Sequence, residues 1–217
     1  NHISFIMDGN KRWSKKKNIT LSKSYDIGVN NLFKIAESCF FEHNINYVSA
    51  FALSSHNMSR SKGVIKPIIK LLDLYLDEFI NSNDKYKYNI RFIGKLDIFN
   101  NQTIKKIDYI NVQKNYKKTL IIALNYSGSD DILDASNLLL KNKKKNLSFK
   151  NFLSTADYPN PDLLIRTGGY QRLSDYFLFQ LSFTEFFFLK TLWPNFKIKS
   201  LHLIVNKFLK IERKFGK

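Results

Sequence analysis

One carboxylate and four arginines stand in short polar stretches that directly follow apolar runs of this 217-residue chain. The first stretch contains Asp8 and Arg12, a later one contains Arg60, and the last contains Arg166 and Arg172. Arginine has a planar guanidinium fork that grips phosphate oxygens with two hydrogen bonds. Magnesium favours a site with one or two carboxylates plus phosphate oxygens. These residue types predict a Mg²⁺-dependent enzyme that acts on diphosphates, without identifying the reaction.

Six apolar runs predict the strands that position these side chains, at residues 2–7, 47–53, 89–94, 119–125, 162–166 and 186–189. Several runs are apolar at consecutive positions, which is typical of strands buried on both faces in parallel sheets. Apolar residues repeat at helical spacing between them, over residues 24–42, 66–80, 101–114, 129–141, 174–183 and 198–213. The alternation predicts one α/β domain over residues 1–217, with a mainly parallel six-stranded sheet and flanking helices.

Open parallel sheets bind ligands at the carboxyl ends of their strands. The polar residues that follow the predicted strands should therefore meet on one rim: Asp8, Asn10, Arg12, Asn57, Arg60, Arg166, Arg172 and Ser174. Taken singly, each has an ordinary structural explanation, since Asp8-Gly9 is a common turn and Arg166 could be a strand-end surface charge. Their joint placement at several strand ends favours a binding site.

The composition leaves more than one anionic partner open. The formal net charge of +17 fits nucleic acid, an acidic lipid surface or a diphosphate substrate, but lysine runs such as 15–17 and 143–145 also fit a solvated surface. The arginines cluster with glycines instead of along one helix, so we do not expect nucleic-acid binding. The single cysteine, Cys39, excludes an internal disulfide, and no Cys/His cluster has zinc-ligand spacing.

No apolar stretch of the sequence is long enough to span a bilayer. The chain begins with Asn1 and not with methionine, so a preceding segment with targeting information is an open possibility. The compartment therefore stays open between the cytoplasm and association with an organelle or endoplasmic reticulum membrane.

Five ordered blocks of the chain resemble the signatures of the cis-prenyltransferases, the family that includes the undecaprenyl and dehydrodolichyl diphosphate synthases. The first block contains Met7-Asp8-Gly9-Asn10, and the last contains Arg166-Thr167-Gly168-Gly169. The blocks cover residues 2–13, 51–60, 90–94, 124–128, and 161–169 together with 172–178 and 192–194. The similarity is colinear from residue 2 to about residue 216, which makes it far more specific than any single block.

The resemblance implies a two-layer α/β homodimer with an apolar tunnel beside the sheet. It implies an enzyme that adds isopentenyl diphosphate to an allylic diphosphate, farnesyl or geranylgeranyl diphosphate, and makes a long polyprenyl diphosphate for a dolichol or undecaprenyl-type carrier lipid. A lipid product further implies peripheral association with a membrane.

By match to the family motifs, Asp8 and Asn57 are catalytic, and Mg²⁺ is held by Asp8 together with Glu185 supplied across the dimer. The substrate-binding residues implied by the resemblance are Gly9, Asn10, Lys11, Arg12, Trp13, Tyr25, Ser54, Ser55, Arg60, Arg166, Arg172 and Ser174.

Several positions depart from the family pattern. Tyr25 stands where a histidine is expected, Leu21 where many members have arginine, and His56 where a glutamate is usual. The remaining departures are Lys11 for glycine, Met58 for an aromatic residue, Tyr170-Gln171 for a Glu-His pair, and Lys214 for arginine in the C-terminal ending. These changes leave reaction rate, product length and the choice of allylic substrate open. Some members are non-catalytic subunits that lack the acidic motif, and the presence of Asp8 favours a catalytic chain.

Overall fold

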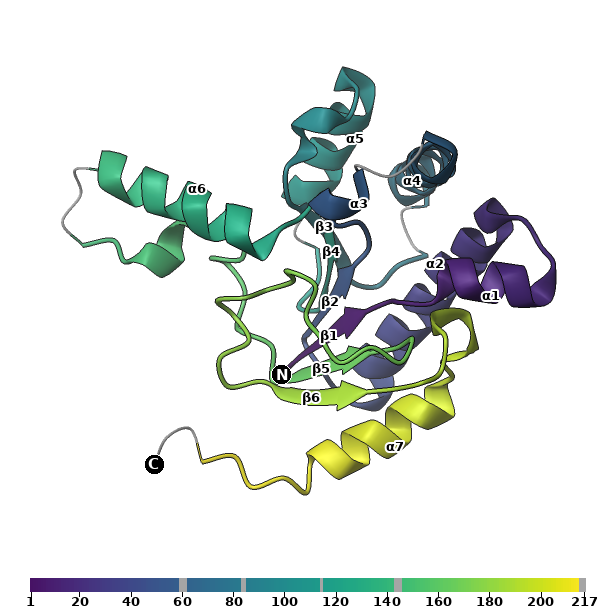
Figure 1. Ribbon diagram of the computed structural model, residues 1–217. Helices are drawn as coiled ribbons and strands as arrows, with labels where there is room; N and C mark the ends of the chain where they lie inside the picture. The colour runs from purple at the N-terminus through teal and green to yellow at the C-terminus, as the bar shows by residue number, and fades with distance from the viewer. Residues whose placement is uncertain (59–61, 83–84, 114, 143–145, 215–217) are drawn as a thin grey trace.

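The computed structural model describes the chain except residues 59–61, 83–84, 114, 143–145 and 215–217, and it describes no side chains over 57–65. Six parallel strands form one sheet in the order β3-β4-β2-β1-β5-β6 (Figure 1). The strands are β1 His2–Ile6, β2 Tyr47–Phe51, β3 Asn89–Ile93, β4 Thr119–Ala123, β5 Leu163–Arg166 and β6 Glu185–Phe188. The predicted parallel α/β sheet is confirmed, with the predicted strand ends correct to within two residues.

Strand β1 lies in the middle of the sheet, between β2 and β5. Its last residue, Ile6, pairs with Phe51 of β2 and with Arg166 of β5. The polar stretches that follow these three strands therefore start side by side at the carboxyl edge of the sheet, which is the edge formed by the carboxyl ends of the strands. The opposite edge is called the amino edge below.

The two faces of the sheet have different coverings. Ile3 and Phe5 of β1 belong to a large apolar core with residues of four helices, α2, α4, α5 and α7. Ile6 belongs to a smaller core on the other face, where Tyr176 and Phe177 are fully buried. This alternation follows from the two-residue period of a strand, and burial on both faces explains the consecutive apolar residues in the sequence.

The α-helices are α1 Asn10–Lys17, α2 Leu21–Glu37, α3 Ser55–Met58, α4 Lys62–Asn81, α5 Asn101–Val112, α6 Gly128–Lys141 and α7 Ile198–Phe208. A π-helical turn, Ser38–Glu42, extends α2, and 3-10 turns lie at Leu96–Ile98, Phe149–Phe152 and Trp193–Asn195. Side-chain caps begin three of the helices, because Thr20, Asn100 and Ser127 accept hydrogen bonds from backbone amides of α2, α5 and α6. Helix α6 projects away from the sheet (Figure 1).

The helix predicted over residues 174–183 is wrong. Ser174, Asp175 and Phe177 have positive φ angles of 54°, 64° and 49°, which a right-handed helix cannot contain. The apolar residues Tyr176, Phe177 and Leu181 are spaced as in a helix, which led to the wrong prediction. In the structure they belong to an irregular segment that packs them against the sheet. Helix α1 was not predicted; it begins after Gly9, whose φ of 118° makes the turn out of β1.

Across the described residues, no helix combines the length and the apolar character that crossing a membrane would need.

Candidate active site

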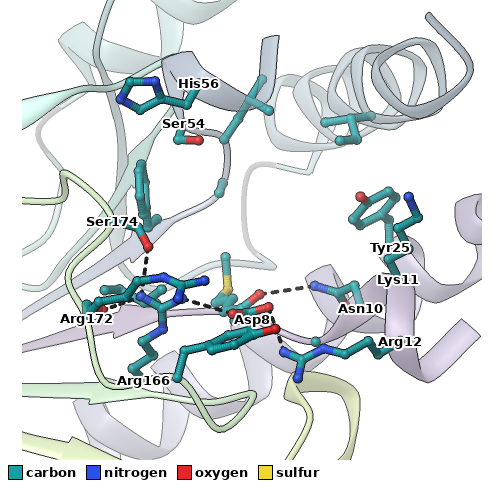
Figure 2. Close-up of a pocket in the computed structure, with 18 of the residues that line it drawn as sticks. Asp8, Asn10, Lys11, Arg12, Tyr25, Ser54, His56, Arg166, Arg172 and Ser174 are labelled. Atoms are coloured by element: carbon teal, nitrogen blue, oxygen red, sulfur yellow. Dashed lines mark hydrogen bonds and ion pairs between the residues drawn. The ribbon is translucent and has the colours of Figure 1, made fainter. Parts of the chain in front are cut away.

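A cavity of about 890 Å³ opens at the carboxyl edge of the sheet, where β1, β2 and β5 end (Figure 2). Its lining contains ten of the residues implied by the sequence: Asp8, Gly9, Asn10, Lys11, Arg12, Tyr25, Ser54, Arg166, Arg172 and Ser174. They come from four separate parts of the chain. Six of the eight residues expected to meet on one rim line this cavity, and the other two, Asn57 and Arg60, have side chains outside what the structure describes.

The carboxylate of Asp8 lies between two guanidinium groups. Its Oδ1 is 3.1 Å from Nη2 of Arg12, and its Oδ2 is 3.0 Å from Nη2 of Arg166. The Asp8 side chain is 28% exposed, whereas that of Arg166 is only 4% exposed. Figure 2 shows both contacts on the floor of the cavity. The two arginines fix the position of the carboxylate, and the three side chains together carry a net positive charge.

Backbone contacts fix the position of Asp8. Its carbonyl oxygen accepts hydrogen bonds from the Thr167 hydroxyl at 2.8 Å and from the Trp193 amide at 3.0 Å. Gly168 has a φ of +90°, and a Cβ atom there would come within 2.6 Å of Nη2 of Arg12 and 2.9 Å of Cβ of Asp8. The Gly168 carbonyl accepts a hydrogen bond from Nη1 of Arg12 at 2.6 Å. Glycine is required here because the chain passes directly against the ion pair.

Arg166 is oriented by the irregular segment that follows β5. Its Nη1 donates to the Ser174 hydroxyl at 2.9 Å and to the carbonyl oxygen of Arg172. Its Nε is buried and has no hydrogen-bond partner in the described part of the chain. Arg166 thus joins Asp8 of the first strand end to Ser174, and the positive φ of Ser174 turns that residue toward the cavity.

The start of α1 provides a second anion-binding feature. Asn10 is the first residue of this helix, and the preceding Gly9 has no side chain to cap the first amides. Helix N-termini attract anions through their unsatisfied N–H groups and the helix dipole. The Asn10 side chain donates to the Met7 carbonyl at 3.2 Å, and its buried Oδ1 has no partner among the described residues.

The cavity continues into an apolar pocket beside the sheet. This second cavity, of about 120 Å³, shares Met7, Tyr25, Phe51 and other residues with the first. Beyond them its walls come from α2, α4 and the sheet: Val29, Leu32, Phe33, Leu71, Leu72, Tyr75, Phe79, Phe92, Ile122 and Leu124. The expected apolar tunnel beside the sheet thus has a counterpart whose entrance lies at the polar cluster.

Sequence reasoning did not place Asp175 or Lys15 in the site and noted His56 only as a departure, yet all three line the large cavity. His56 Nε2 is 3.7 Å from Oδ2 of Asp175. Burial by itself raises the pKa of Asp175, but hydrogen bonds from Ser127 and Ser129 outweigh burial and lower the pKa below its usual range. The positive φ of Asp175 brings it to the cavity, and the sequence gave no signal for that backbone conformation.

Five predicted site residues are not among those that line this cavity in the described structure. Glu185 begins β6, so it lies at the amino edge, on the opposite side of the sheet from Asp8. Trp13 is buried and donates to Asn195 Oδ1 at 2.9 Å, and Ser55 is not in the cavity lining. The side chain of Asn57 lies outside what the structure describes, as does all of Arg60. Within the described residues, no three His, Cys, Asp or Glu side chains form a metal-binding group.

Comparisons with known proteins find relatives along almost the whole chain. A family model described as putative undecaprenyl diphosphate synthase matches residues 6–216. Dehydrodolichyl diphosphate synthase 4 of Arabidopsis thaliana is 37% identical over 99% of this chain and 78% of its own length. The isoprenyl transferase of Rickettsia typhi is 34% identical over 100% of this chain and 97% of its own length.

Two solved structures have the same fold. Lavandulyl diphosphate synthase from Lavandula x intermedia, in complex with dimethylallyl diphosphate, superposes with a TM-score of 0.90 at 29% identity, covering 100% of this chain and 98% of that one. A probable undecaprenyl diphosphate synthase from Campylobacter jejuni superposes with a TM-score of 0.83, also at 29% identity and with the same coverage.

Proposed function

Because the chain belongs to the undecaprenyl diphosphate synthase family of prenyltransferases, we propose that it condenses isopentenyl diphosphate with an allylic prenyl diphosphate. The observation that supports this most is the Asp8 carboxylate between Arg12 and Arg166, at the point where a polar cavity continues into an apolar one. A prenyl diphosphate has the same two parts, a charged head and a hydrocarbon tail.

The two sides of the polar cavity suit two diphosphate groups. We assign the isopentenyl diphosphate group to Arg166, Arg172 and Ser174, whose donors gather on the segment after β5. We assign the allylic diphosphate to Arg12 and to Asn10 with the first amides of α1. The allylic tail then enters the apolar cavity, where each buried methylene contributes about 0.8 kcal/mol.

The reaction breaks the allylic carbon–oxygen bond and joins the allylic carbon to the double bond of isopentenyl diphosphate, with loss of one proton. Negative charge grows on the departing diphosphate as the bond breaks, so the arginines stabilise the transition state more than the bound substrate. Arg12, which we assign to the allylic diphosphate, is well suited to this role because its ion pair with Asp8 and its hydrogen bond to the Gly168 carbonyl already hold it in place. Holding both substrates in line lowers the entropic cost of forming the new bond.

Asp8 fits a role as a ligand of Mg²⁺. Magnesium usually binds one or two carboxylates together with phosphate oxygens and water, and Asp8 offers a partly exposed carboxylate beside the proposed diphosphate sites. When bound, the ion would supply Lewis-acid stabilisation of the diphosphate charge. Glu185 lies at the other edge of its own sheet, so a second copy of the chain would have to bring it to Asp8. We therefore propose a homodimer as the active form.

The relatives guide the choice of product. Dehydrodolichyl diphosphate synthases among them lead us to propose a long polyprenyl diphosphate, a precursor of a dolichol or undecaprenyl-type carrier lipid, with farnesyl or geranylgeranyl diphosphate as the starter. A product of this kind would bring the enzyme to a membrane surface as a peripheral protein.

The test is incorporation of labelled isopentenyl diphosphate by the purified chain, with farnesyl, geranylgeranyl or dimethylallyl diphosphate as separate starters and chromatography of the products. We expect Mg²⁺-dependent elongation that a chelator abolishes and added Mg²⁺ restores. A folded chain that incorporates no isopentenyl diphosphate with any starter would contradict the proposal. Product formed from dimethylallyl diphosphate alone would contradict the need for isopentenyl diphosphate.

A further inference from the structure

The ring of Tyr170 lies among three guanidinium groups at the rim of the polar cavity. The Cζ atoms of Arg172, Arg12 and Arg166 are 4.1, 4.9 and 5.8 Å from the centre of this ring. Each distance falls within the range of about 6 Å over which a cation is attracted to an aromatic face. The same ring therefore contacts arginines that we assign to both diphosphate sites.

Backbone hydrogen bonds hold the turn that precedes Tyr170 against the segment that follows β6. The preceding residues, Gly168 and Gly169, have φ angles of +90° and +86° and form a tight turn after β5. Their amides donate to the carbonyl oxygens of Thr191 and Leu189, both at 2.8 Å, which ties the turn to the segment that follows β6. Tyr170 is 44% exposed, so it is not placed by burial in a core.

The three arginines need such a contact because their charges repel one another. Asp8 forms ion pairs with Arg12 and Arg166. In the part of the chain that the structure describes, no carboxylate lies within 4 Å of Arg172, and the Tyr170 ring is the closest aromatic group to its charge. The ring attracts the guanidinium groups and adds no negative charge, so it does not compete with a diphosphate as a carboxylate would.

We propose that Tyr170 is a positioning residue that gathers Arg12, Arg166 and Arg172 at the boundary between the two diphosphate sites. It acts through the face of its ring, and its hydroxyl is not required. The proposal rests on the proposed function, since it takes diphosphate as the ligand of these arginines. It predicts that the ring improves binding of a diphosphate group before any prenyl transfer occurs.

The test compares Tyr170→Leu with Tyr170→Phe and measures binding of inorganic pyrophosphate by titration calorimetry at low ionic strength. Leucine keeps apolar bulk but has no aromatic face, and we expect it to weaken pyrophosphate binding about tenfold. Phenylalanine keeps the face and should stay within about twofold of the natural chain. Tyr109→Leu is the matched control, because Tyr109 is 53% exposed on α5 and lies outside the cavity lining.

Steady-state kinetics provide a second readout. The Tyr170→Leu change should raise KM for isopentenyl diphosphate about tenfold, with a smaller effect on kcat. The Tyr170→Phe change should leave this KM close to that of the natural chain. Pyrophosphate binding by Tyr170→Leu that equals the natural chain, or a Phe variant as weak as the Leu variant, would overturn the inference. If Tyr170→Leu unfolds, Tyr170→Gln tests the same loss of the ring with a polar side chain.

The two proposals can fail separately. A natural chain that binds pyrophosphate and shows the Leu and Phe difference, but transfers no prenyl group, contradicts the proposed function and leaves the role of the ring intact. A chain that transfers prenyl groups with the same KM in the Leu variant contradicts the role of Tyr170 alone.

Discussion

Asp8 and Asp162 form ion pairs with arginines at opposite edges of the same sheet. Asp8 follows β1 at the carboxyl edge and pairs with Arg166 at 3.0 Å, whereas Asp162 precedes β5 at the amino edge and pairs with Arg213 at 2.6 Å. Their side chains are 28% and 26% exposed. Neither the residue types nor the exposed fraction of the carboxylate side chain distinguishes the two pairs.

Their surroundings do distinguish them. Asp162 also accepts the His2 amide at 3.1 Å, and Arg213 donates to the Phe183 carbonyl at 2.8 Å, so this pair connects distant segments of the chain. The arginine partners of Asp8 instead line a cavity of about 890 Å³ that also contains Arg172 and Ser174. A carboxylate–arginine pair becomes a candidate site when further donors and open volume adjoin it, and otherwise it stabilises the fold. The predictions below test this difference.

The largest effect should come from Asp8→Asn. Asparagine has nearly the same shape and keeps an oxygen that can accept from Arg12 or Arg166, but it removes the negative charge proposed to hold Mg²⁺. We expect turnover per folded molecule in the isopentenyl incorporation assay to fall about 1000-fold, and the lost charge should also lower the free energy of unfolding by about 2 kcal/mol. Turnover within tenfold of the natural chain would show that the Asp8 carboxylate is not at the chemical centre.

The second prediction concerns acid unfolding, which should be governed by the amino edge. His2 is buried at the start of β1, with Nδ1 2.6 Å from the Pro159 carbonyl and Nε2 2.9 Å from the Ser49 hydroxyl. Burial lowers the pKa of His2 from 6.5 to about 4, although the Pro159 carbonyl and Asp162 act in the opposite direction. His2 in the folded chain therefore binds a proton less readily than His2 in the unfolded chain, where its pKa is 6.5.

It follows that stability is fully present above pH 6.5 and is lost as the pH falls toward 4. The loss from His2 alone should reach about 3 kcal/mol in the free energy of unfolding. Urea unfolding between pH 7.5 and 4.5 measures it, with His2→Gln as the variant that cannot titrate at this position. An equal acid loss in that variant would mean that His2 titrates normally and that the amino edge is less tightly packed than the structure indicates.

A smaller effect should follow from Asp162→Asn, which is matched in chemistry to Asp8→Asn. The amide keeps one acceptor for Arg213 but loses the charge of the pair, so we expect a loss of about 2 kcal/mol in the free energy of unfolding. Turnover per folded molecule should fall far less than in Asp8→Asn, because the Asp162 side chain is at the opposite edge from its own cavity and Asp162 contacts Glu185 only through its backbone carbonyl in the described structure. A large loss of turnover at full stability would remove the distinction between the two pairs.

Much of the fold and part of the site could be predicted from the sequence, for identifiable reasons. Strands such as β4 are apolar at successive positions because both faces are covered, and strand ends bring Asp8 and Arg166 together through parallel topology alone. The segment around Asp175 could not be predicted, because its apolar spacing is that of a helix while its positive φ angles depend on packing against the sheet. The contact of Tyr170 with three arginines is likewise a tertiary property, and the sequence showed only that the residue departs from the family pattern.

The smallest effect expected at the carboxyl edge is that of Ser174→Ala. Ser174 accepts a hydrogen bond from Nη1 of Arg166 at 2.9 Å, while the Arg172 carbonyl and Asp8 continue to hold the same guanidinium group in the variant. Serine and alanine are both strained at the φ of 54° found here, so the substitution tests the hydroxyl and not the backbone. Loss of this one bond, about 1 kcal/mol, should raise KM for isopentenyl diphosphate about fivefold with kcat nearly unchanged. Ser182→Ala is the control, because Ser182 is also exposed, its hydroxyl donates to the Phe179 carbonyl at 3.0 Å, and it is not in the cavity lining. Equal KM values for isopentenyl diphosphate in the two variants would place its diphosphate group away from Ser174. Of the contacts tested at the carboxyl edge, only those of Asp8 with its two arginines would then remain as candidates for a role in the reaction.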